Sequence, residues 1–138
     1  MDLDPHISEG HRIRVSKRLV NLFKHWQLSL EEQLGILGIQ NTNPYPIICY
    51  LEGARLSNDE DLFKRVRILL NMHKSLRLLF PNDRNLAYAW MTTPNRSFNG
   101  LTPTEVVMEQ GNMGVSMVQS YLDYHLNGLQ AVLERHSD

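Results

Sequence analysis

The 138-residue sequence has one cysteine, no long apolar run and almost no net charge, and each of these features excludes a class of protein. A single thiol, Cys49, cannot form an internal disulfide or a cysteine-based metal cluster, and it suits a reducing compartment. No apolar run approaches the roughly 20 residues that a bilayer requires. The first ten residues are acidic, with no Lys or Arg and no apolar run, which is the opposite of a signal peptide. We therefore expect a cytoplasmic protein with no membrane partner.

The sequence also lacks the motifs of common catalytic and metal sites. Its histidines include no His-x-x-x-His or His-Glu-x-x-His pair, and Gly35 and Gly38 are too few for a phosphate-binding loop. Cys49 lies within an apolar run, where a buried and unreactive thiol is the expected state. We therefore predict a protein that is not an enzyme and that holds no cofactor and no metal.

The charges that are present are strongly segregated, although the formal net charge is only −1. Residues 11–25 contain five basic residues and no acid, whereas residues 26–53 contain three acids and no Lys or Arg. After Arg84 the chain turns acidic. A nearly neutral chain is not a general polyanion binder, so the basic N-terminal segment is the candidate for phosphate contacts.

Apolar periodicity predicts helices in the first part of the chain, and polar start signals set their limits. One amphipathic helix spans residues 13–26, with a cationic polar face. Ser29 and Glu32 form a capping box that begins a short second helix, which ends at Gly38. Residues 40–51 then form a turn-rich segment followed by an apolar run.

The next segment carries the signals of a long helix followed by a short one. A capping box of Ser57 and Glu60 predicts a helix that Pro81 closes after about 23 residues. Its apolar stripe includes a histidine, His73, which we expect to lie in the core with its polar atoms satisfied by a neighbour. Asn82 or Asp83 can cap the short helix that follows.

The last two helices complete an all-α pattern. Residues 102–105, Thr-Pro-Thr-Glu, supply a third capping box with proline at the first helical position, for a helix that runs to Gly111. A final helix runs to Gly128, and one or two further turns follow it. Because every segment has the helical period and none alternates like a strand, the predicted fold class is all-α.

Two groups of residues resemble a known family. Residues 28–39, Leu-Ser-Leu-Glu-Glu-Gln-Leu-Gly-Ile-Leu-Gly-Ile, resemble the opening of Xre-type repressor domains, and Tyr50-Leu51-Glu52-Gly53 resembles the end of their recognition segment. The C-terminal half resembles the toxin-binding domain of the Xre/MbcA/ParS antitoxin family. Its motifs are Lys74-Ser75-Leu76-Arg77-Leu78-Leu79-Phe80-Pro81, Ala87-Tyr88-Ala89-Trp90, Thr93-Pro94-Asn95, Phe98-Asn99-Gly100-Leu101-Thr102-Pro103 and the later Gly128. The resemblance covers residues 19–128, with the motifs in family order.

This resemblance implies an antitoxin paired with a RES-domain toxin, an enzyme that consumes NAD and is silenced when the antitoxin covers its active-site cleft. It implies a helix-turn-helix domain over residues 1–56 and a toxin-binding domain over residues 57–138. Homodimerisation and repression of its own operon are further implied properties, so the partners would be the cognate toxin, a second copy and operator DNA. Two alternatives remain: a transcriptional regulator whose only partner is DNA, and a structural or interaction module.

The candidate DNA contacts fall into two sets. Base contacts are expected from Gln40, Asn41, Thr42 and Asn43, and phosphate contacts from Arg12, Arg14, Lys17 and Arg18. Pro44 and Pro46, however, shorten or distort the expected recognition helix, and no cation lies between Trp26 and Ala54. Two interpretations stay open, a working DNA-binding module and a retained fold whose DNA contact is weak or lost. The basic face of the first helix is in the same way either a phosphate-binding surface or a solvated one.

The candidate toxin contacts are polar positions near the last helices. The conspicuous apolar residues of the C-terminal motifs, Phe80, Trp90, Phe98 and Leu101, are mostly needed for the core of a small helical domain. Toxin contact is therefore expected at Arg96, Asn99, Gln119, Asp123, Glu134 and Asp138. The acidic tail, residues 128–138, either reaches into a toxin cleft that binds an anionic dinucleotide or is a frayed terminus.

Overall fold

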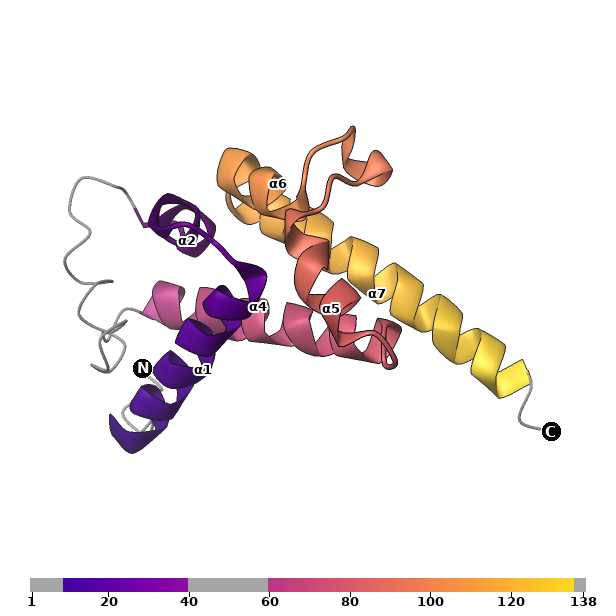
Figure 1. Cartoon of the computed structure of the whole chain (residues 1–138), viewed down its shortest axis with the longest axis horizontal. Helices are drawn as coiled ribbons and strands as arrows, with labels where there is room; N and C mark the ends of the chain where they lie inside the picture. Colours follow the sequence, from indigo (N-terminus) through magenta and orange to yellow (C-terminus); the bar gives the residue numbers. More distant parts are fainter. Residues whose placement is uncertain (1–8, 40–59, 136–138) are drawn as a thin grey trace. The chain divides into compact units, whose positions relative to one another are not determined.

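The structure is a computed structural model that describes residues 9–39 and 60–135 (Figure 1). Within these ranges every regular element is a helix, which confirms the predicted all-α class. None of the described helices combines the length and low polarity of a membrane-spanning segment. The elements are α1 (Glu9–Trp26), α2 (Leu30–Leu37), α4 (Glu60–Leu79), α5 (Arg84–Ala89), the 3₁₀ helices η2 (Trp90–Thr92) and η3 (Arg96–Phe98), α6 (Pro103–Gln110) and α7 (Asn112–Arg135).

The chain divides into two compact units, Met1–Leu70 and Asn71–Asp138, here called the N-terminal unit and the C-terminal unit. The division falls inside α4. The domain boundary predicted from the sequence, between residues 56 and 57, lies outside the described residues, so domain limits of 1–56 and 57–138 stay a prediction.

The N-terminal unit is built on α1, whose apolar stripe is buried as predicted. The buried side chains are Val15, Leu19, Leu22, Phe23 and Trp26. The helix begins at Glu9, four residues earlier than the apolar periodicity indicated, because the polar residues of this first turn extend the helix without adding to the stripe. Gln27, in the left-handed region at φ 57°, follows the last helical residue.

The second helix, α2, begins and ends as the sequence predicts. The Ser29 hydroxyl accepts a hydrogen bond from the Glu32 amide at 3.1 Å, and the Glu32 carboxylate accepts one from the Ser29 amide at 2.8 Å. Gly38 closes the helix in the left-handed conformation. The Arg65 guanidinium of α4 donates to the Ile36 carbonyl at 2.9 Å and thereby satisfies an unpaired group at the negative end of α2. Burial lowers the pKa of Arg65, a group that nevertheless remains charged.

In the C-terminal unit, α4 stops at Leu79 and Pro81 follows, as expected. Of the two predicted caps for the next helix, the structure uses Asp83, whose carboxylate accepts a hydrogen bond from the Leu86 amide at 3.0 Å. The 3₁₀ helix η2 continues directly from α5. The Thr104 hydroxyl, which is buried, donates to the Met91 carbonyl at 2.7 Å and ties η2 to the first turn of α6.

Helices α6 and α7 form a close hairpin. The predicted capping box of Thr102 and Glu105 is present, with Pro103 in the first turn of α6. Gly111 ends α6 with φ 59°. Gly114 is buried on the first turn of α7, and a Cβ atom there would overlap the carbonyl oxygen of Val106. Glycine therefore sets how closely the two helices approach.

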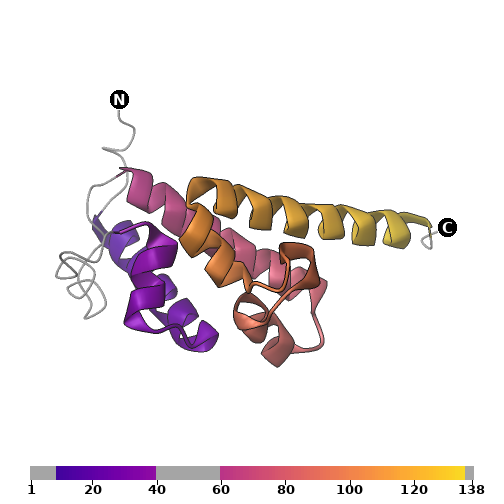
Figure 2. The ribbon, with the colours of Figure 1, turned by 90° about the horizontal axis from the view of Figure 1, so that it is seen from above.

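The predicted helical turns after Gly128 are present, but the predicted end of the last helix at Gly128 is wrong. α7 is one helix of 24 residues from Asn112 to Arg135, unbroken in Figure 1 and Figure 2. A glycine ends a helix by adopting a left-handed conformation, as Gly38 does, but Gly128 has no positive φ. It is instead accommodated inside the helix, at a cost of about 1 kcal/mol relative to alanine.

Candidate protein-binding surface

α7 has an unusual composition for a helix with so much exposed surface. Over residues 112–133 its only Asp, Glu, Lys or Arg is Asp123. One stripe is buried in the C-terminal unit, formed by Val115, Val118 and Leu122. Besides these buried residues, large apolar and aromatic side chains are exposed on the same helix: Met113, Met117, Tyr124, Leu129, Val132 and Leu133.

This composition is typical of a protein interface. A helix that borders only solvent has one apolar stripe and a charged outer face. The cores of protein–protein interfaces are instead depleted in charge and enriched in methionine and aromatic residues. The exposed part of α7 matches the second description, so α7 is the candidate binding element of the C-terminal unit.

An aromatic cluster joins α7 to the 3₁₀ helices. The ring centroid of Tyr121 lies 5.7 Å from that of Trp90, 5.3 Å from that of Phe98 and 4.4 Å from that of His125. Tyr124 stands edge-on to His125 at 5.4 Å and is 74% exposed. The cluster therefore runs from the buried Phe98 to a largely exposed tyrosine, and it fixes the loop of η2 and η3 against α7.

Of the four conspicuous residues of the C-terminal motifs that the sequence assigned mostly to the core, one is buried and three are half-buried. Phe98 is buried, as predicted. Phe80, Trp90 and Leu101 are half-buried, because each lies at the margin of a small unit that has too few residues to cover them. His73 is also half-buried, and its ring stacks on that of Tyr88 with centroids 5.1 Å apart. Among the described residues no group of three His, Cys, Asp or Glu side chains is placed to hold a metal ion.

The loop that carries two predicted toxin contacts, Arg96 and Asn99, is closed by its own backbone. The Asn95 amide donates to the Leu101 carbonyl at 3.0 Å, and the Gly100 amide donates to the Asn95 carbonyl at 3.0 Å. Asn99 has a left-handed φ of 59°, which asparagine tolerates better than most residues, so it has a local structural role besides any contact. Both side chains are exposed on this braced loop.

The other predicted toxin contacts lie on α7 or beyond it. Gln119 and Asp123 are four residues apart and share one face of the helix, with Gln119 half-buried and Asp123 exposed. Glu134 lies in the last turn of α7, and Asp138 lies outside the described residues. The polar prediction missed the exposed apolar side chains of α7, although the near absence of charge over residues 112–133 was visible in the sequence.

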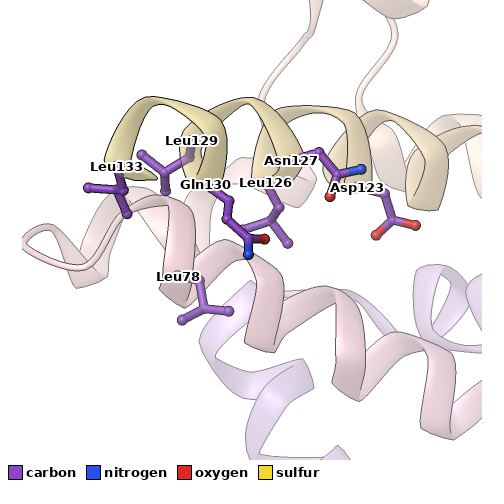
Figure 3. Close-up of a pocket in the computed structure, with 7 residues that line it drawn as sticks. All are labelled: Leu78, Asp123, Leu126, Asn127, Leu129, Gln130 and Leu133. Carbon is purple, nitrogen blue, oxygen red and sulfur yellow. The ribbon is translucent and has the colours of Figure 1, made fainter. Parts of the chain in front are cut away.

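An open groove of about 560 Å³ lies between the end of α4 and the C-terminal half of α7 (Figure 3). Figure 3 shows Leu78 of α4 across from the α7 residues. We call this feature the leucine groove; it is lined by Leu78, Leu126, Leu129 and Leu133, with Asp123, Asn127 and Gln130 as its polar members.

The predicted phosphate contacts lie on α1. Arg14, Lys17 and Arg18 are exposed and follow one another at helical spacing on one face, and Arg12 lies in the same helix. The predicted base contacts, Gln40, Asn41, Thr42 and Asn43, lie outside the described residues together with Pro44 and Pro46. The two interpretations of the helix-turn-helix segment therefore both stay predictions.

Comparison with known proteins gives a family match within the C-terminal unit. Residues 75–134 match the family model described as the antitoxin Xre/MbcA/ParS C-terminal toxin-binding domain. The match begins near the end of α4 and includes α5, both 3₁₀ helices, α6 and nearly all of α7. Over 118 residues the chain is also 25% identical to an uncharacterized protein of Sinorhizobium fredii, y4oB, covering 83% of this chain and 88% of that protein. The segment with the interface-like helix is thus similar to a domain that binds toxins, which supports an antitoxin role.

Proposed function

We propose that this protein is an antitoxin that binds a toxin enzyme through its C-terminal unit and covers the toxin's active site. The observation that carries the proposal is that the toxin-binding family match falls on α7, a helix with one charged residue over residues 112–133 and many exposed apolar side chains. The partner that the sequence resemblance implies is a RES-domain toxin, which consumes NAD. The protein would act in the cytoplasm by occlusion and without chemistry of its own.

Binding of a toxin in this way requires an interface of standard size. A nanomolar dissociation constant corresponds to about −12 kcal/mol, and stable complexes of this kind bury roughly 1,600 Å² in total. The apolar side chains of α7 and the aromatic cluster would form the centre of such a patch, and Arg96, Asn99, Gln119 and Asp123 would lie among its polar contacts. Exposed aromatic and arginine side chains are the residue types that contribute most to binding at such centres.

The test is co-expression with the product of the adjoining gene. We expect the toxin to deplete NAD and stop growth when expressed alone, and co-expression of this chain to restore both. We also expect the two proteins to co-purify as a stoichiometric complex. Two soluble, folded proteins that do not associate would contradict the proposal, as would an adjoining gene product without effect on NAD.

A second function, repression of its own operon through DNA binding, is favoured by the exposed cations Arg14, Lys17 and Arg18 of α1. We propose that the chain binds operator DNA as a homodimer, with these side chains on the phosphates. Gel shifts on the operon's promoter, without toxin and at several salt concentrations, test this. Replacing the three cations by glutamine should reduce the slope of log K against log salt by up to about 2.7, or about 0.9 for each phosphate contact removed. An unchanged slope would assign the cations to a solvated face.

A further inference from the structure

The buried stripe of α7 continues beyond the part of the helix that the C-terminal unit covers. Val115, Val118 and Leu122 are buried, and the same helical spacing leads on to Leu126, Leu129 and Leu133. In this second half the leucines form the leucine groove, where Leu129 is 37% and Leu133 is 61% exposed. Leu78, across the groove on α4, is 55% exposed. The core stripe therefore becomes an accessible apolar surface at this point.

The shape of the leucine groove indicates what kind of group it accommodates. Its lining extends along α7 from residue 123 to residue 133, which at 1.5 Å per residue is about 15 Å. A compact small molecule does not need that length, whereas an amphipathic helix places side chains at i, i+3 or i+4 and i+7 along it. The elongated apolar lining thus fits two to three turns of a helix.

The size of the groove argues against a second copy of this chain as the occupant. A stable dimer needs about 800 Å² and roughly 20–30 residues from each partner. The leucine groove is lined by seven residues, so it cannot hold two copies together by itself. It is instead of the size of a central pocket in a larger interface, where a few anchor side chains carry most of the affinity.

The polar lining gives the occupant an orientation. Asp123 is exposed at one end of the groove and is the only charged residue among its lining residues. A carboxylate there favours a Lys or Arg, or the positive end of a helix. Asn127 and Gln130 add uncharged amide groups. The complementary surface is therefore an apolar helix face with its positive end toward Asp123.

From these observations we infer that the leucine groove docks one amphipathic helix of the partner protein, with three apolar side chains on the leucines and a cation or helix N-terminus at Asp123. The inference rests on the proposed function, because the partner is the toxin that the C-terminal unit is proposed to cover. It assigns the anchor of that contact to apolar residues in place of the polar positions that the sequence indicated.

The test uses the full chain and measures affinity for the product of the adjoining gene by titration calorimetry. Leu78→Gln and Leu133→Gln should each weaken binding about tenfold, the loss of an anchor residue, and the double variant should weaken it further. Because both side chains are largely exposed, circular dichroism and the midpoint of thermal unfolding should not change. Matched controls are Leu86→Gln on α5 and Leu30→Gln on α2, 44% and 41% exposed, which should bind like the natural chain.

The orientation is tested at Asp123. Asp123→Lys should weaken binding more than Asp123→Asn, and the difference between them should shrink as salt is raised. A photo-crosslinker placed at position 133 should label a single helix of the partner. Labelling spread over many partner segments would contradict a single docked helix.

The outcomes separate this inference from the function on which it rests. If the natural chain binds the gene product and the groove variants bind it equally well, the leucine groove is not the docking site and the proposed function stands. If the natural chain does not bind at all, both are wrong. If the groove variants keep their affinity but change from dimer to monomer in light scattering, the groove joins two copies of the chain and the inference is overturned.

Discussion

The two long helices α1 and α7 bury similar apolar stripes but differ in the chemical character of the side chains that they expose. α1 presents the cations Arg14, Lys17 and Arg18, whereas α7 presents methionine, tyrosine, leucine and valine side chains with a single charge before its last two residues. A cationic face is stable in water and attracts polyanions. An apolar face is unfavourable in water, and burying it against a protein partner removes that unfavourable free energy. The exposed residues of the two helices, and not their buried stripes, are therefore what distinguishes the partners proposed for the two units.

The largest expected effect is a loss of stability when the close contact between α6 and α7 is disturbed. Gly114→Ala places a Cβ atom against the Val106 carbonyl, so α6 and α7 must separate. We expect the free energy of unfolding to fall by about 1–3 kcal/mol, the usual cost of overpacking. Urea denaturation measures the stability, and partner affinity should fall with it.

Gly128 provides the matched control for Gly114. It lies in the same helix, but a Cβ atom there meets open space. Gly128→Ala should therefore stabilise the chain by about 0.5–1 kcal/mol, because alanine has the higher helix propensity. Equal effects of the two substitutions on stability would contradict the close approach of α6 and α7 at Gly114.

Placing a charge on the exposed face of α7, and an apolar residue on the exposed face of α1, tests the contrast between the two helices directly. Met117→Lys adds a charge to the exposed face of α7 and should weaken toxin binding about tenfold, or about 1.4 kcal/mol, without changing stability. Lys17→Met on α1 should leave toxin binding unchanged and weaken promoter binding. Both affinities are measured on the same two variants.

The two proposed binding activities should also differ in how their affinities depend on salt concentration. Toxin affinity should vary little between about 50 and 200 mM salt, whereas promoter affinity should fall steeply over the same range. If Lys17→Met weakened toxin binding as much as Met117→Lys does, the division of roles between the two helices would be wrong.

The smallest expected effects concern the two capping boxes, one in each unit. Ser29→Ala and Thr102→Ala each remove a side-chain acceptor from a helix N-terminus and should each cost about 1 kcal/mol of stability. Ser29→Thr and Thr102→Ser, which keep the hydroxyl, serve as controls and should cost much less. Amide hydrogen exchange should show faster exchange in the first turn of α2 for the first alanine variant and of α6 for the second. Loss of protection throughout the chain in either variant would contradict a local role.

The helix boundaries that the sequence predicted correctly depend on groups a few residues apart. Ser29 with Glu32, and Thr102 with Glu105, form their hydrogen bonds within one turn, and the Gly38 amide bonds back to the Gly35 carbonyl of its own helix. Where no such signal exists the prediction failed. The start of α1 has no apolar periodicity, and Gly128 carries the same residue type as a helix end without its conformation.

The candidate site was harder to predict than the helices that form it. The polar positions were chosen because apolar residues were assigned to the core. The residues that the structure brings together in the leucine groove, Leu78 and Leu133, are 55 positions apart in the sequence, and no local pattern relates them.

The all-α class, most helix caps and the toxin-binding resemblance of the C-terminal half could be predicted from the sequence, because local hydrogen bonds and apolar periodicity relate residues that are close together in the chain. Which apolar residues are covered could be seen only once the helices were packed together. One stripe of aliphatic residues at helical spacing contains all six of these positions: Val115, Val118, Leu122, Leu126, Leu129 and Leu133. The first three are buried by the C-terminal unit, whereas the last three line an open groove, since burial depends on what packs against a helix and not on the helix alone.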